Sequence, residues 1–131
     1  MEHAEITEKI LSCCFDVIHE LGTGFFESVY QKSLFIALKE NGVDAQEQVP
    51  LSVYFHKQCV GEFFADIIVE NKVIVEIKAV KTLLPEHQAQ LINYLNATGL
   101  NVGLLVNFGN AKLEYKRLHG RHNKDRHELQ D

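Results

Sequence analysis

The sequence predicts a mixed α/β (α+β) domain in which helices flank one central mixed β-sheet. Two observations predict this class. Apolar residues recur at helical spacing over the first forty positions, and they form alternating or continuous strand-like runs between residues 49 and 78. One more helical segment then separates two further strand-like runs, an order typical of a sheet covered by helices. We expect residues 1–118 to form a single domain and 119–131 to form a polar C-terminal tail.

Three helices are expected. The first ends before Gly22, because glycine readily follows a helix C-terminus. The second runs from about Phe25 to Asn41 and ends before Gly42. The third begins at Pro85, a residue suited to a first helical turn, and runs to about Thr98. The apolar stripe of the first helix comprises Ile6, Ile10, Cys14, Val17, Ile18 and Leu21.

Five strands are expected, because these runs are rich in β-branched and aromatic residues and are bounded by turn residues. They cover residues 49–55, 59–69, 73–78, 102–108 and 113–118. The chain order is therefore two helices, three strands, a helix and two strands.

Composition excludes several classes of protein. With 46% hydrophobic and 24% charged residues, the 131-residue chain is not disordered over its bulk. No apolar run approaches the roughly 20 residues that span a bilayer, so we expect no membrane partner. Acidic residues among the first twenty argue against a targeting segment, and a cytoplasmic location is expected. Three cysteines without CxxC spacing indicate small buried side chains rather than a zinc site.

Charge is distributed unevenly along the chain. Residues 1–70 carry 4 basic and 12 acidic side chains, whereas residues 71–131 carry 9 basic and 6 acidic ones. A surface that contacts phosphate is therefore expected to draw on the second half, although uneven charge is also common in small proteins.

Charged residues interrupt two strongly apolar strands. Asp66 lies in the second predicted strand, and Glu76 and Lys78 lie in the third. If residues 70–72 form a three-residue loop, Asp66 lies opposite Glu76 on one face of the sheet. A two-residue loop instead places Asp66 opposite Val75, on the other face.

Paired carboxylates in apolar strands favour a bound cation, because two adjacent negative charges repel one another. Mg²⁺ prefers oxygen ligands and binds phosphate well, and a nearby lysine such as Lys78 can stabilise developing charge. The alternative is a cross-strand ladder of ion pairs without a metal, which remains open at this point.

Two further clusters lie on predicted helices. One face of the third helix carries His87, Gln90 and Tyr94. These side chains either face the carboxylates across the sheet or form an ordinary solvated helix face. Glu27 lies on the apolar stripe of the second helix. It either completes a metal site or, with Gly24 as N-cap, caps the helix at position N3.

The segments GFFESVY (residues 24–30), ADIIVENKVIVEIKA (65–79) and QLINYL (90–95) together resemble the GxxExxY protein family, a branch of the PD-(D/E)XK nuclease superfamily. The resemblance covers roughly residues 5 to 118. It implies a restriction-endonuclease-like core and a nuclease of nucleic acids that uses Mg²⁺ or Mn²⁺.

The resemblance also implies roles for individual residues. Asp66 and Glu76 are the expected metal ligands, helped by the backbone carbonyl of Ile77, and Lys78 is the expected catalytic base or charge stabiliser. Glu27 matches an acid that assists the metal.

The residues expected to contact or orient the substrate are Gln90, Tyr94, Lys81 and Tyr30.

We therefore expect a metal-dependent phosphodiesterase, with DNA or RNA as substrate and a homodimer as one arrangement on a duplex. The acidic first half favours one alternative, a catalytically silent module of the same fold that binds a protein or nucleic-acid partner. A second alternative is a structural ion-pair cluster without metal.

Overall fold

The computed structural model describes residues 1–121, so residues 122–131 of the predicted tail lie outside it. The order of elements in the chain is the predicted one. They are α1 (Ala4–Leu21), α2 (Glu27–Glu40), β1 (Ala45–Phe55), β2 (Gln58–Val69), β3 (Val73–Lys78), α3 (Pro85–Thr98), β4 (Val102–Asn107) and β5 (Glu114–His119). Apart from β1, which begins four residues before its prediction, the bounds agree within two residues.

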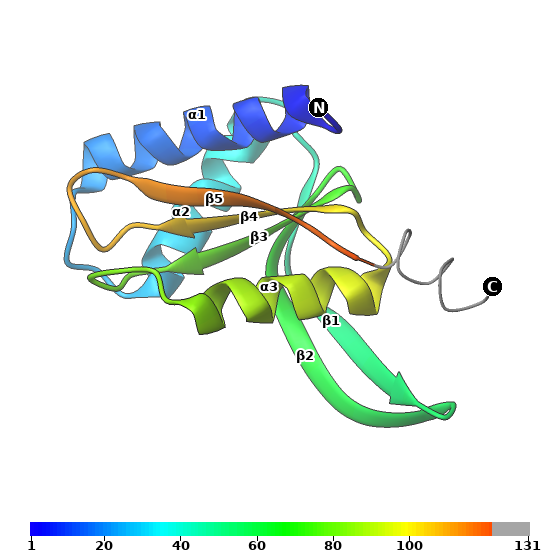
Figure 1. Ribbon diagram of the computed structural model, residues 1–131. Helices are drawn as coiled ribbons and strands as arrows, with labels where there is room; N and C mark the ends of the chain where they lie inside the picture. Colours follow the sequence, from blue (N-terminus) through cyan, green and yellow to red (C-terminus); the bar gives the residue numbers. More distant parts are fainter. Residues whose placement is uncertain (122–131) are drawn as a thin grey trace.

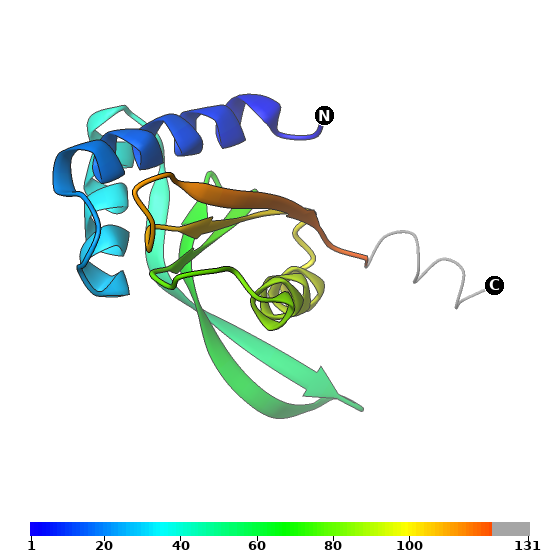
Figure 2. The same ribbon diagram turned by 60° about the vertical axis from the view of Figure 1, so that its left-hand side comes forward.

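The five strands form one mixed sheet in the order β1-β2-β3-β4-β5. Only β3 and β4 are parallel, because α3 connects them by a crossover, and the other neighbours are antiparallel. Helices α1 and α2 cover one face of the sheet and α3 covers the other (Figures 1 and 2). The predicted mixed α/β class with a helix-flanked sheet is confirmed.

Each face of the sheet has its own hydrophobic cluster. On the α1–α2 side, Leu34 and Val75 belong to the larger cluster. On the α3 side, Leu91 packs with Ile74 and Leu105 in a smaller one. Successive residues of β3 thus alternate between the two clusters, as expected for a strand covered on both faces.

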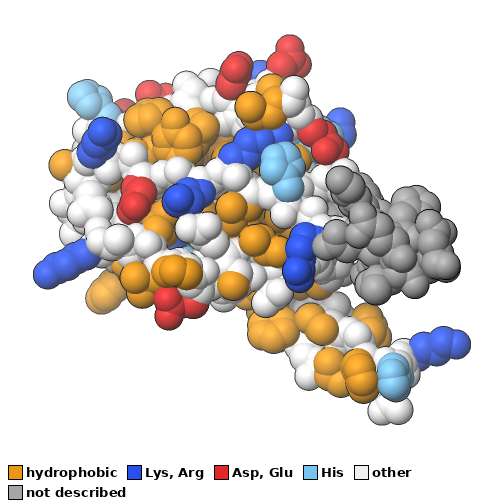
Figure 3. Space-filling model, in the orientation of Figure 1, with side chains coloured by type: hydrophobic (Ala, Val, Ile, Leu, Met, Phe, Trp, Pro, Cys, Tyr) orange, Lys and Arg blue, Asp and Glu red, His pale blue; other side chains and the backbone are white. Residues whose placement is uncertain are grey.

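The hairpin formed by β1 and β2 projects beyond the rest of the sheet (Figure 1). Its outer part is paired only with itself, since β2 pairs with β3 only from Ile67 to Val69. Hydrophobic side chains gather along the hairpin on the face shown in Figure 3. The large exposed ones are Tyr54, Phe55, Val60, Phe63 and Phe64.

The cysteines fit the expected buried role only in part. Cys13 and Cys14 are buried in α1, but Cys59 is exposed on the hairpin. The prediction for Cys59 was wrong because the hairpin extends past the layers that bury the central strands. None of the helices within residues 1–121 is both long and apolar enough to cross a membrane.

Candidate active site

The site lies where β2 separates from β3. Val69 pairs with Val73, so the connecting loop has three residues, as one of the two predicted registers requires. Glu70 and Asn71 adopt left-handed backbone conformations in this loop, with φ of 55° and 54°. The ladder continues to Ile67 and Val75 and then stops.

Beyond the end of this ladder, two carboxylates accept hydrogen bonds from backbone N–H groups of the facing strand. The backbone N–H of Asp66 donates to Oε1 of Glu76 at 3.0 Å, and the backbone N–H of Ile77 donates to Oδ2 of Asp66 at 2.8 Å. The three-residue loop therefore brings Asp66 and Glu76 together, as expected. Among residues 1–121, neither carboxylate forms an ion pair.

Glu76 is an acid in an apolar setting. It is only 4% exposed, on a strand whose neighbours Val75 and Ile77 are fully buried. Burial, followed by the adjacent charge of Asp66, raises the pKa of Glu76 from its ordinary 4.5 to about 8. A buried carboxyl of this kind is typical of a site that holds a proton or a cation.

A chain of polar groups connects the sheet to α3. Nζ of Lys78 donates to Oε1 of Gln90 at 3.1 Å, and Nε2 of Gln90 donates to the hydroxyl of Tyr94 at 3.1 Å. Gln90 thus uses both ends of its amide to hold Lys78 and Tyr94. Of the predicted polar face, Tyr94 lies near enough to both carboxylates for their charges to raise the pKa of its phenol, and Gln90 connects it to Lys78.

Tyr94 retains its proton at neutral pH. Burial, followed by the nearby charge of Glu76, raises the pKa of its phenol above the usual value. Because its oxygen already accepts from Gln90, its own hydrogen is available to an acceptor such as a phosphate oxygen. His87 has a different role, since its Nδ1 accepts the backbone N–H of Leu84 at the start of α3.

Sequence reasoning missed Gln48, which contacts Asp66, and Gln31, which contacts Gln48. Nε2 of Gln48 donates to Oδ1 of Asp66 at 3.3 Å and to Oε1 of Gln31 at 2.7 Å. Gln48 has a φ of 46° inside β1, an unusual backbone conformation that only the folded strand reveals. Gln31 could have been suspected, because it lies one helical turn after Glu27.

Glu27 does not join the two carboxylates. It is the first residue of α2 and is exposed, and the N-cap is Phe26 rather than Gly24. The capping alternative was therefore also wrong in position, although an acid in the first turn still favours the helix dipole. The described residues contain no cluster of three or more potential metal-ligating side chains from His, Cys, Asp and Glu.

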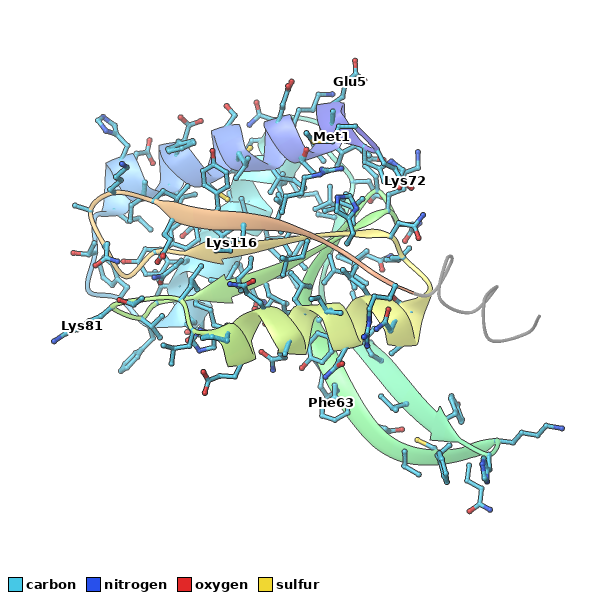
Figure 4. The ribbon with its side chains drawn as sticks, in the orientation of Figure 1. Met1, Glu5, Phe63, Lys72, Lys81 and Lys116 are labelled. Atoms are coloured by element: carbon cyan, nitrogen blue, oxygen red, sulfur yellow. The ribbon has the colours of Figure 1, made fainter. Side chains whose placement is uncertain are left out.

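Neither Tyr30 nor Lys81 forms a hydrogen bond or ion pair with the two carboxylates. Tyr30 has no exposed surface: its ring stacks on Phe108 at 4.7 Å, and its hydroxyl donates to the carbonyl of Gly22 at 2.6 Å. Burial therefore gives Tyr30 a structural role and corrects the expectation that it contacts substrate. Lys81 is exposed beyond the end of β3, and Figure 4 shows its side chain directed away from the molecule.

The donor set fits a divalent cation of the magnesium type. Asp66 and Glu76 provide adjacent carboxylates without a protein cation paired to either among residues 1–121. In a strand, the C=O of a residue points to the same edge as its N–H. The carbonyl of Ile77 therefore also points toward Asp66, at the edge that β2 has left. Mg²⁺ is commonly held by one or two carboxylates together with water.

Comparison with known proteins identifies related folds. A family model described as PD-(D/E)XK nuclease superfamily matches residues 4–118. The crystal structure of SSO0001 is 22% identical with a TM-score of 0.58, over 98% of this chain and 68% of that one. An alkaline exonuclease from Laribacter hongkongensis is 13% identical with a TM-score of 0.49, over 95% and 86% of the two chains. A search of curated proteins found no match.

Proposed function

This chain belongs to the PD-(D/E)XK nuclease superfamily, and from that premise we propose that it hydrolyses phosphodiester bonds of nucleic acid with a divalent metal ion. Nucleases of this superfamily generally depend on such metals. One observation carries the proposal. Asp66 and Glu76 lie together at the point where β2 leaves β3, and Lys78 and Tyr94 are held beside them through Gln90.

The proposed ligands are Asp66, Glu76 and the carbonyl of Ile77, and the ion is Mg²⁺ or Mn²⁺. Bound there, the ion would supply Lewis-acid stabilisation of the charge that develops on phosphate. Glu27 lies outside this set, at the exposed start of α2.

Side chains of the protein supply the other proposed roles in substrate binding and catalysis. The charge of Lys78 is close enough to Glu76 to lower the pKa of that carboxyl, and from there it offsets developing negative charge or orients the attacking water. Tyr94 donates its hydroxyl hydrogen to a phosphate oxygen. Gln90 is a positioning residue, because its amide fixes both of these side chains. Lys81 contributes attraction to the nucleic-acid backbone from the end of β3.

Cleavage assays test the proposal. Labelled single- and double-stranded DNA and RNA are incubated with Mg²⁺ or Mn²⁺, and products are separated on denaturing gels. Lys78→Ala should lower the rate by about 100-fold or more, the usual cost of removing one stabilising group. Lys72→Ala, which removes an exposed lysine from the β2–β3 loop, is the matched control and should leave the rate unchanged.

Calorimetry distinguishes the alternatives. If Mn²⁺ binds and Asp66→Ala abolishes this binding, but no nucleic acid is cleaved, the protein is a silent binding module. If Mn²⁺ produces no heat, the carboxylates form a structural cluster without metal.

Finer assignments belong to the same proposal. The spacing of Gly24, Glu27 and Tyr30 supports membership of the GxxExxY branch. We further propose action in the cytoplasm, where the free thiols of its cysteines would stay reduced. A homodimer on duplex substrate stays a prediction that light scattering can test.

A further inference from the structure

A cleft of about 740 Å³ separates the projecting hairpin from α3. The hairpin contributes Tyr54 and Phe63 to its walls, and α3 contributes Gln90, Asn93 and Tyr94. Figure 4 shows Phe63 on β2 beneath α3. The volume lies in the range of pockets that enclose a small organic group.

The walls of the cleft combine aromatic rings with amides. Tyr54 and Phe63 are 65% and 44% exposed, so their rings are available to a ligand, and the ring of Phe63 lies 5.9 Å from that of Tyr94. Amide side chains supply both donors and acceptors. The lining includes the carboxylate of Glu86 and contains no lysine or arginine. Such a lining suits a flat, uncharged heterocycle with a hydrogen-bonding edge, and it does not suit a phosphate chain.

The cleft is continuous with the candidate active site. Gln90 and Tyr94 line the cleft, and they are also the residues that hold Lys78. A group bound in the cleft is therefore placed next to the position where the scissile phosphate would be attacked.

We propose that this cleft binds an unpaired nucleobase of the substrate, so that the protein acts on single-stranded rather than base-paired nucleic acid; this rests on the nuclease function proposed above. A base within a duplex has both faces stacked and its edge paired. It can offer neither to Tyr54, Phe63 and the amides unless it leaves the helix. Stacking on aromatic side chains is the usual way in which proteins hold single strands.

Binding measurements in EDTA test the cleft without hydrolysis. The probe is a fluorescein-labelled single-stranded DNA oligonucleotide, read by anisotropy, with the blunt duplex of the same sequence for comparison. Phe63→Ala and Tyr54→Ala should each weaken single-strand affinity roughly 5- to 100-fold. Because Tyr54 has no ring contact with Tyr94, the second variant reports on the cleft without disturbing that side chain.

Phe64→Ala is the matched control. Phe64 is 54% exposed on the same strand, but it points to the opposite face from Phe63 and does not line the cleft. This variant should bind within about 2-fold of the wild type. A series of oligonucleotides, each with one abasic position, locates the bound base. One of them should bind the wild-type protein as weakly as the intact oligonucleotide binds Phe63→Ala. The affinity of Phe63→Ala itself should be the same for that abasic oligonucleotide as for the intact one.

The outcomes separate the two proposals. Equal affinity of wild type, Phe63→Ala and Tyr54→Ala overturns the base-binding cleft, even if Lys78→Ala abolishes cleavage. Phe63-dependent binding without any cleavage keeps the cleft and overturns the hydrolytic function. If size-exclusion chromatography shows that Phe63→Ala only dissociates a dimer, the cleft holds a second copy of the chain and the inference fails.

Discussion

Glu76→Gln is expected to remove a marked pH dependence of stability. In the folded protein Glu76 keeps its proton until a pKa of about 8, whereas in the unfolded chain it loses that proton near 4.5. Between these values the folded state binds more protons, so the free energy of unfolding decreases as the pH rises. At roughly 1.4 kcal/mol for each pH unit, the loss across this interval reaches roughly 5 kcal/mol. That is a large part of the ~5–15 kcal/mol by which a domain is stable.

The measurement is urea unfolding at pH 5, 7 and 9 in EDTA. Glutamine keeps an oxygen that can accept the backbone N–H of Asp66 but has no proton to lose, so the variant should lack the wild-type decline attributable to Glu76. Glu62→Gln removes an exposed acid from the hairpin and should retain the wild-type slope. Addition of Mg²⁺ at pH 9 should restore stability to the wild type but much less to Glu76→Gln, since the ion needs the ionised carboxylate.

Parallel pH profiles for wild type and Glu76→Gln would refute this reasoning. Glu76 would then ionise in the folded protein at the same pH as in the unfolded chain. Burial beside Asp66 would carry no cost for its charge.

Three further variants probe the scaffold by urea and thermal unfolding. Tyr30→Phe should lower the free energy of unfolding by about 1–3 kcal/mol, because the carbonyl of Gly22 loses its hydrogen-bond donor. The variant should leave Mn²⁺ affinity unchanged, and a loss of Mn²⁺ binding would contradict the structural role of Tyr30. Asn107→Ala should cost about 2–4 kcal/mol, since its buried amide bonds both the N–H and the C=O of Val80. Gly109→Ala should also lower the Tm, because the added Cβ would overlap the carbonyl oxygen of Val80; an unchanged Tm would contradict this close approach.

The order of the elements could be predicted because each has a local signal. The 3.6-residue period of α1, the proline that opens α3 and the apolar runs of β3 and β4 are all visible in neighbouring residues. The beginning of β1 at Ala45 lacked such a signal. Ala45 becomes part of a strand because it pairs with Val69, which is distant in the sequence.

The spacing of residues along the sequence predicted only part of the candidate site. Two registers were open for Asp66, and the left-handed conformations of Glu70 and Asn71 belong to the one that the structure adopts. Glu27 and Tyr30 belong to the sequence motif from which site residues were expected. In the structure, however, Glu27 is exposed at the start of α2 and Tyr30 is buried in the core. A motif records residue types at fixed spacing, and it does not say which side chain the neighbouring layers will cover.

The sequence by itself determined the classes of side chain available for chemistry and the elements that carry them, because helical and strand periods are local properties. Only the tertiary structure decided where β2 leaves β3, which glutamine contacts Asp66 and how the hairpin and α3 enclose a cleft. These features arise from packing between segments far apart in the chain. Local periodicity carries no information about such contacts.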